Sequence, residues 1–165
     1  MWRPEKIISG GQTGADIGGL VGAERCAIAT GGCAPRDFKT ENGSQPILKT
    51  RFGLMAHPSP NYRDRTQANV DKADATIIFA TNSESAGTRL TIEFCESLGK
   101  AWILLDPYDD AAIQQFFSFI ESKRPAILNI AGHRESVSPG IAKKVASIVA
   151  AVFSTMPEKS STIAC

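Results

Sequence analysis

The sequence predicts an α/β fold of three layers, with a mainly parallel, twisted sheet and helices on both of its faces. Two observations lead to this prediction. Short apolar, β-branched runs alternate along the chain with segments whose apolar residues recur every three or four positions. The later runs, Thr76–Phe79 and Trp102–Leu105, are almost continuously apolar, as is typical of parallel strands covered on both sides. Strands that alternate with helices need crossover connections, and these place helices on both faces of one sheet.

The first elements are expected to be a strand, a helix and a second strand. Lys6–Ser9 is a short apolar run that stops at two glycines. Ile17, Leu20 and Val21 form the apolar stripe of the helix that follows, and the glycines beside them allow close contact with a neighbouring backbone. Ala27–Thr30 is the second strand candidate.

Residues 33 to 66 break this pattern, because they show little periodicity and hold prolines at positions 35, 46, 58 and 60. A loop of this length inside one domain is usually functional or disordered. It carries six Lys and Arg against three Asp and Glu, an excess of +3, whereas the whole chain has a net charge of +1. Positive charge is therefore concentrated here, although Lys39, Lys49 and Arg51 are equally well explained as solvated loop charges.

The remaining elements resume the alternation. A helix is expected to begin near Arg63, and the helices after it are indicated by apolar stripes ending at Leu98, Ile120 and Val152. The corresponding strands are Ala75–Ala80, Ala101–Leu105 and Ala126–Ile130.

Composition indicates an ordinary globular protein. The 165 residues are 42% hydrophobic and 21% charged, and the net charge gives no general attraction to nucleic acid or to a membrane surface. No apolar stretch is long enough to span a bilayer, and the N-terminus lacks the apolar core of a signal peptide. The four cysteines have no metal-ligand spacing. We expect a cytoplasmic protein with a single domain over residues 1–155 and a short polar tail over residues 156–165.

The first strand ends in a glycine-rich turn, which is the most informative motif of the chain. Glycine permits tight backbone conformations and close approach of a ligand, and the first N–H groups of a helix attract anions. The turn therefore predicts a phosphate or oxyanion site, unless it only joins the strand to the helix. The chain lacks the Gly-Lys-Ser/Thr of a Walker loop, and no acidic residue ends the next strand as a dinucleotide site would require. The residues of this candidate site are Gly10, Gly11, Gln12, Thr13 and Gly14.

Four other loops should lie beside this turn, because ligands of doubly wound sheets bind beyond the carboxyl ends of the strands. These loops are rich in small and polar residues, and two of them carry arginines. Gly87 and Thr88 open a second helix, although Thr88 or Ser85 would also serve as its cap. The candidate ligand contacts in these loops are Gly32, Arg36, Gly87, Thr88, Gly132 and Arg134.

Three further side chains are candidates for the same ligand. Arg65 and Asn69 are four residues apart and share a helix face; arginine suits an oxyanion, and asparagine can read a base or pterin edge. Alternatively, Arg65 pairs with Asp64 or Glu41. Asp16 suits the positive end of the first helix, where it would either cap the helix or face a ribose hydroxyl or a cation.

The sequence offers no catalytic or metal-binding group. His57 and His133 each stand alone, and neither Ser9 nor Cys33 has an evident histidine base. We therefore expect a binding protein more than an enzyme.

Eight segments together resemble the molybdenum carrier family, whose members are similar to molybdenum cofactor carrier protein. That family is related to the YpsA-type and the lonely-guy, lysine-decarboxylase-like Rossmann proteins. The resemblance spans residues 6 to 153. The segments that carry it are Ser9–Asp16, Gly31–Arg36, Glu41–Gly43, Arg65–Val70, Ala73–Thr76, Ala86–Thr91, Leu128–Gly132 and Arg134–Ser136.

The resemblance implies a Rossmann-like fold, a homo-oligomer (dimer or tetramer) and a small phosphate-bearing ligand. The implied cargo is the molybdenum cofactor (molybdopterin, a pterin with a terminal phosphate) or a nucleotide-like molecule. The alternative is a phosphoribohydrolase acting on nucleoside monophosphates, or another enzyme that cleaves N-glycosides. The hydrolase signature places a glutamate three residues after the threonine of Gly-Thr, where this chain has Thr91. Cleavage of this kind needs a placed carboxylate, so the departure favours binding.

Overall fold

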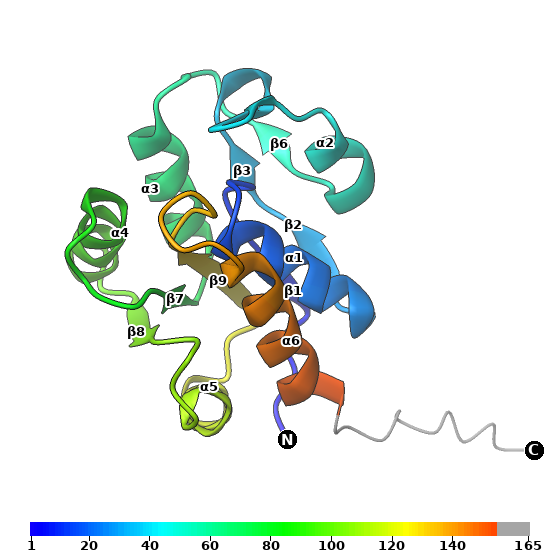
Figure 1. Ribbon diagram of the computed structural model, residues 1–165, viewed down its shortest axis with the longest axis vertical. Coiled ribbons are helices and arrows are strands. Elements are labelled where there is room, and N and C mark those ends of the chain that lie inside the picture. Colours follow the sequence, from blue (N-terminus) through cyan, green and yellow to red (C-terminus); the bar gives the residue numbers. More distant parts are fainter. Residues whose placement is uncertain (155–165) are drawn as a thin grey trace, which may run out of the picture.

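The core of the fold is a five-stranded parallel sheet. The computed structural model describes residues 1–154, so the tail expected at residues 156–165 lies outside the described residues. The strand order is β2-β1-β9-β7-β8, and every neighbouring pair is parallel (Figure 1). The predicted α/β fold with a Rossmann-like sheet is therefore confirmed. The strands are β1 (Lys6–Ile8), β2 (Ala29–Gly31), β7 (Ala75–Phe79), β8 (Ala101–Leu105) and β9 (Ile127–Gly132).

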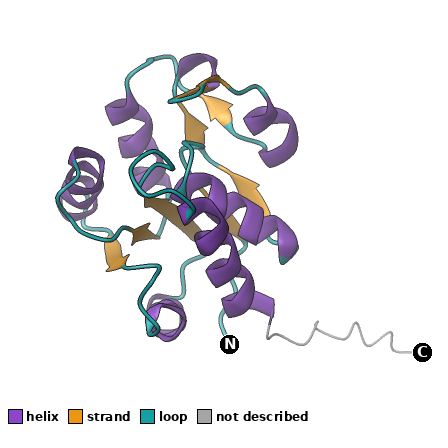
Figure 2. Ribbon diagram, viewed as in Figure 1, coloured by secondary structure: helices purple, strands orange, loops and turns teal. Residues whose placement is uncertain are grey.

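Helices cover both faces of the sheet, as the purple helices around the orange strands in Figure 2 show. The odd-numbered residues of β7, such as Ile77, point into the main core with α1 (Ala15–Arg25), α5 (Ala112–Lys123) and α6 (Ile141–Ser154). Thr76 points the other way and contacts Cys95, which lies in a separate apolar cluster. That cluster joins α3 (Tyr62–Lys72) to α4 (Ala86–Ser97).

The close contact between α1 and α6 depends on two glycines of α1. A Cβ atom on Gly22 would lie 2.6 Å from the Cβ of Val149, and one on Gly18 would lie 2.6 Å from the carbonyl oxygen of Ala142. Both distances are shorter than side chains tolerate, so only glycine lets the two backbones approach this closely. The expected role of these glycines is confirmed.

The irregular segment between residues 33 and 56 folds into short elements packed against α1. Leu48, Phe52 and Leu54 are fully buried with Leu20 of α1 in a small cluster of their own. These elements are too short to show a period in the sequence, which is why no regular structure is predicted there. They are β3 (Cys33–Ala34), η1 (Arg36–Phe38), β4 (Lys39–Thr40), β5 (Gly43–Ser44), α2 (Ile47–Phe52) and β6 (Met55–Ala56).

The boundaries of four strands differ from those expected. β1 and β7 each end one residue early, at Ile8 and Phe79. β2 begins two residues late, because Ala27 adopts a left-handed turn conformation (φ 53°) directly after α1. β9 extends to Gly132, so the start of the loop expected after it still pairs with β7. Among the described helices, none combines the length and the hydropathy needed to cross a bilayer.

Candidate functional site

A cavity of about 300 Å³ opens at the carboxyl ends of the central strands. Its walls come from the turn after β1, the start of α3, the start of α4 and the loop after β9. Six of the predicted ligand contacts line it: Gln12, Asp16, Arg65, Gly87, Gly132 and Arg134. The topology thus brings together residues that are up to 122 positions apart, as the hydrogen bond between Thr13 and Glu135 illustrates.

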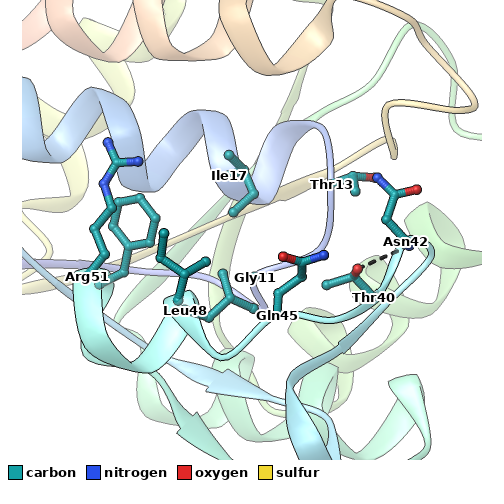
Figure 3. A pocket seen from close by; sticks show the side chains of 10 residues that line it. Gly11, Thr13, Ile17, Thr40, Asn42, Gln45, Leu48 and Arg51 are labelled. Atoms are coloured by element: carbon teal, nitrogen blue, oxygen red, sulfur yellow. Dashed lines mark hydrogen bonds between the residues drawn. The ribbon is translucent and has the colours of Figure 1, made fainter.

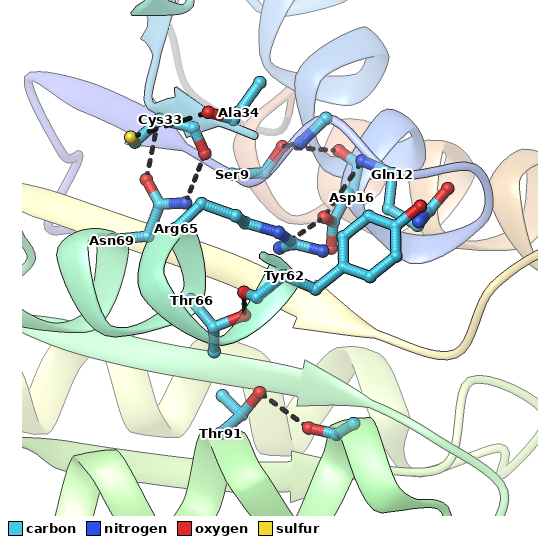
Figure 4. A network of polar contacts seen from close by, with 12 residues as sticks. Ser9, Gln12, Asp16, Cys33, Ala34, Tyr62, Arg65, Thr66, Asn69 and Thr91 are labelled. Carbon is cyan, nitrogen blue, oxygen red and sulfur yellow. Dashed lines mark hydrogen bonds and ion pairs between the residues drawn. The ribbon is translucent and has the colours of Figure 1, made fainter. Parts of the chain in front are cut away.

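Asp16 occupies the position that a bound anion would take in the glycine-rich turn. Its Oδ2 accepts a hydrogen bond from the amide of Gln12 at 3.1 Å, and the guanidinium of Arg65 lies 3.2 Å from the same oxygen (Figure 4). The Asp16 side chain is almost fully buried. Burial raises the pKa of this carboxyl, and the charge of Arg65 opposes that rise. The ion-pair partner of Arg65 is therefore Asp16, and not Asp64 or Glu41.

Three other amides in and next to the turn also have partners within the protein. The amide of Gly11 donates to Ser9 Oγ at 3.2 Å, that of Thr13 donates to Gln12 Oε1 at 3.1 Å, and that of Ala15 donates to the carbonyl of His133 at 3.0 Å. The Asp16 carboxylate thus uses donors that the glycine-rich turn would otherwise offer to an anion. An external anion has to find its donors elsewhere in the cavity.

Cations provide such donors around the ring of Tyr62 at the cavity wall. The guanidinium carbons of Arg134 and Arg65 lie 4.8 and 5.7 Å from the ring centroid, and the Lys39 Nζ lies 5.3 Å from it. Cations at these distances are attracted to the face of an aromatic ring. Asp16 is the one acidic side chain that lines the cavity among the described residues, so positive charge exceeds negative charge there.

The start of α4 adds a helix N-terminus to the cavity. Ser85 caps the helix by accepting a hydrogen bond from the amide of Thr88 at 3.2 Å, and its hydroxyl also pairs with that of Thr88 at 2.8 Å. A Cβ atom on Gly87 would meet nothing within 4 Å, so the backbone of the first turn faces open space. The free amides of the first turn of α4 lie beside the cations around Tyr62, and both would stabilise an anionic group in the cavity. Thr88 itself is part of the N-terminal cap of α4, through its hydrogen bonds with Ser85.

Three side chains that line the cavity, Gln12, Arg65 and His133, have buried nitrogen atoms without a partner among the described residues, and in Arg65 this atom is Nε. Gln12 Oε1 accepts from the amides of Thr13 and Glu41, whereas Gln12 Nε2 is buried and donates to no protein group. His133 is 3% exposed, and neither ring nitrogen makes a well-formed hydrogen bond. Burial lowers the pKa of His133, against a weaker opposing contact with the backbone of Asn82. Buried donors without partners are unfavourable, and a ligand can relieve that cost.

Glu41 ties the irregular segment to the rim of the cavity. Its carboxylate accepts hydrogen bonds from the hydroxyl of Thr13 and from the amide and hydroxyl of Ser136, the amide at 3.2 Å. Desolvation raises the pKa of Glu41, but the bonds from Ser136 and Thr13 outweigh it, so the pKa is lowered. Glu41 thus fixes the loop that carries Arg134.

The other predicted contacts lie in structural positions. Asn69 is buried and exchanges two hydrogen bonds of 2.8 Å with the backbone of Cys33, which fastens β3 to α3. Arg36 is exposed beside Asp37, outside the cavity. A Cβ atom on Gly14 (φ 84°) would lie 2.3 Å from the carbonyl of His133, so this glycine lets two loops meet. The same close packing at strand ends involves Gly10, Gly11, Gly32 and Gly132.

A second cavity of similar volume lies on the other side of the turn, between α1 and α2 (Figure 3). Its walls are mainly apolar, with Ile17, Leu48 and Phe52 among them. Its one charged side chain, Arg51, pairs with Glu24 at 2.7 Å. It therefore lacks the free charge of the first cavity. Among residues 1–154, no group of three His, Cys, Asp or Glu side chains could hold a metal ion.

Sequence reasoning did not single out Tyr62 as a site residue. The sequence does hold an indication of its role, since this aromatic residue stands just before Arg63 and Arg65 at the start of a helix. Its importance depends on Lys39 and Arg134, which reach the ring from elements distant in the sequence. Periodicity cannot reveal a contact of that kind.

Comparisons with known proteins agree with this architecture. The model of the circularly permutated YpsA SLOG family matches residues 7–153. The crystal structure of the "Putative molybdenum carrier protein" from Syntrophus aciditrophicus SB superposes with a TM-score of 0.82 and 33% sequence identity. The superposition covers 92% of this chain and 96% of that one. No curated protein matches the chain.

Proposed function

The chain belongs to the circularly permutated YpsA SLOG family, and we propose that it is a carrier that binds the molybdenum cofactor, or a related phosphate-bearing pterin or nucleotide, in the cavity beyond β1, β7 and β9. The observation that carries the proposal is the cavity itself. It combines two arginines beside Tyr62, Arg65 and Arg134, with the open start of α4 and a buried amide nitrogen that has no partner among the described residues. The solved relative is named as a molybdenum carrier, which supports this cargo.

The ligand would lie with its phosphate toward Arg134 and the first turn of α4. Arginine forms paired hydrogen bonds with phosphate oxygens, and helix N-termini stabilise the same charge. A planar ring would then lie toward Tyr62 and the turn after β1, because an aromatic side chain provides a stacking surface. The protein would act as a cytoplasmic homo-oligomer.

Carriage explains the cavity better than catalysis does. The carboxylate in the cavity, Asp16, is held by Arg65 and by the turn, and Thr91 stands where related hydrolases have a glutamate. A carrier has to bind and shield its cargo and needs no acid–base pair.

The test is co-elution of protein and cargo. Purified protein is mixed anaerobically with molybdenum cofactor, separated by gel filtration, and the protein peak is assayed for molybdenum and for pterin fluorescence. We expect one pterin per binding site in the wild type. Arg134→Ala should weaken binding at least about tenfold, since it removes a charged hydrogen-bond donor.

Arg51→Ala is the matched control, because Arg51 lies outside the cavity in a surface ion pair. It should retain the cargo. Absence of pterin from the wild-type peak, or equal loss in both variants, would refute the carrier proposal.

A further inference from the structure

Among the buried nitrogens without partners that line the cavity, the side-chain amide nitrogen of Gln12 is held in a fixed orientation. The amide of Gln12 cannot flip without losing two hydrogen bonds, because its Oε1 accepts from the backbone amides of Thr13 and Glu41 at 3.1 and 2.9 Å. The Nε2 group therefore points away from both, and it is buried with no partner among the described residues. Gln12 itself is 4% exposed. A ligand group that meets this nitrogen has to be an acceptor.

Asp16 presents acceptors beside this donor. The hydrogen bonds from Gln12 and Arg65 both end on Oδ2, and the backbone amide of Gly10 also contacts the carboxylate. The two oxygens of a carboxylate offer about four acceptor positions, so acceptor capacity remains for other donors. The phosphate of a ligand would be repelled by this carboxylate, so it cannot be the group that enters here. Figure 4 shows Asp16, Gln12 and the ring of Tyr62 next to one another. The end of the cavity thus combines a donor, a carboxylate and a flat aromatic surface.

We infer that Gln12 and Asp16 read the edge of a fused heteroaromatic ring that carries a carbonyl, a ring N–H and an amino group in a row. Gln12 Nε2 donates to the ring carbonyl, and the remaining acceptor positions of the Asp16 carboxylate accept from the ring N–H and the exocyclic amino group. This 2-amino-4-oxo pyrimidine edge is shared by pterins and guanine. The inference rests on the proposed function and adds to it the selectivity for the ring.

Other rings fail at this edge for electrostatic reasons. Adenine presents an amino group where Gln12 Nε2 needs an acceptor, and a ring nitrogen lone pair toward Asp16. A 2-oxo ring, as in xanthine or lumazine, places an oxygen against the carboxylate. Hypoxanthine keeps the carbonyl and the N–H but lacks the amino group. A site with buried polar groups rejects analogues that leave those groups unpaired.

The test compares ligands that differ only at this edge. GMP, IMP, XMP and AMP carry the same ribose phosphate, and their affinities for the full-length wild type are measured by calorimetry. Pterin and lumazine are compared by fluorescence titration, which separates the pterin source from the guanine source. We expect the 2-amino-4-oxo member of each series to bind at least about tenfold more tightly than its analogues.

Two variants refine the test. Asp16→Asn replaces one acceptor by a donor, so the preference should move from GMP toward XMP. Gln12→Glu keeps the bonds to Thr13 and Glu41 but opposes the ring carbonyl with an oxygen, so GMP affinity should fall about tenfold. Asp37→Asn is the matched control, because Asp37 is exposed and lies outside the cavity. The wild-type series decides the question even if Asp16→Asn does not fold.

The outcomes separate this inference from the carrier proposal. Equal affinity for all four nucleotides, or tighter binding of AMP, would refute the reading of the ring edge and leave the carrier proposal intact. Failure of every phosphate-bearing ring to bind would refute both.

Discussion

At the scale of single residues, the buried pair of Asp16 and Arg65 dominates the site. The Arg65 Nη1 lies 3.2 Å from Asp16 Oδ2, and the two side chains are 12% and 4% exposed. Removing one partner of a buried ion pair leaves the other charge without compensation, which costs more than losing the attraction alone. The pair therefore holds the turn after β1 in place, in addition to any contact that Arg65 makes with a ligand.

The first prediction concerns this pair. Arg65→Met should lower the free energy of unfolding by about 3 kcal/mol, because it leaves the buried carboxylate of Asp16 without its cationic partner. In an Asp16→Asn background the same change should cost much less. Urea denaturation of the four proteins in the cycle measures the difference. Equal losses in both backgrounds would contradict the coupling.

The second prediction follows from the raised pKa of Asp16. A carboxyl whose pKa is higher in the folded state binds its proton more tightly there, so ionisation at higher pH opposes folding. Wild-type stability relative to Asp16→Asn should fall as the pH rises above the ordinary value of 3.8, and should level off above the raised pKa. Urea midpoints at pH 4 to 8 test this. A relative stability that increases over this window would contradict the assigned direction.

At the scale of elements, the irregular segment and the loop after β9 behave as a linked pair. Glu41 joins them through Thr13 and Ser136, and Arg134 lies in the loop thus held. The position of Arg134 at the cavity wall therefore depends on the irregular segment that contains Glu41, which the sequence alone presents as a long loop.

The third prediction tests this link. Glu41→Gln retains the size of the side chain but removes part of its acceptor capacity, so amides near Ser136 should exchange hydrogen faster and GMP affinity should fall up to about tenfold. Hydrogen exchange and calorimetry measure the two effects. Glu96→Gln, an exposed position on α4, is the control. Unchanged exchange in Glu41→Gln would show that the link does not hold the loop.

The fourth prediction concerns the contact between α1 and α6. Gly22→Ala should destabilise the protein by about 1–3 kcal/mol, because the new methyl group overlaps Val149. Gly87→Ala is the matched control in another helix, where the methyl group meets open space and stability should be kept or rise by up to about 1 kcal/mol. Thermal melts compare the two. A Gly22→Ala protein as stable as Gly87→Ala would contradict this packing.

At the scale of the whole molecule, the proposed function is binding of a ligand in the cavity. The fifth prediction is that purified protein releases free base from purine and pyrimidine monophosphates far more slowly than about 1 per second, a common enzymatic rate. The physical reason is that Asp16, the one acidic side chain lining the cavity among the described residues, is held by Arg65 and by the turn. A placed acid–base pair is worth about 100- to 10,000-fold. Chromatography of the reaction mixture measures it. Steady turnover near that rate, lost in Asp16→Asn, would favour the enzyme alternative.

Much of the fold could be predicted from the sequence, because buried parallel strands leave apolar runs and helices leave periodic stripes. The segment from Cys33 to Ala56 could not, since its strands are only two residues long. The carboxyl-end loops were predictable as a group. The roles within them were not, because the capture of the turn amides by Asp16 is a side-chain contact that no spacing reveals.

The place of β9 also constrains when the site can exist. β9 is the last strand along the described chain, yet it lies between β1 and β7 in the middle of the sheet. During synthesis, β2-β1 and β7-β8 emerge first as two pairs with no strand to bridge them. The loop that carries Arg134 emerges later still. A nascent chain that has not yet reached this strand therefore holds neither a continuous sheet nor a finished cavity. The ligand that we propose can bind only after residues 127–137 have left the ribosome and packed into the fold.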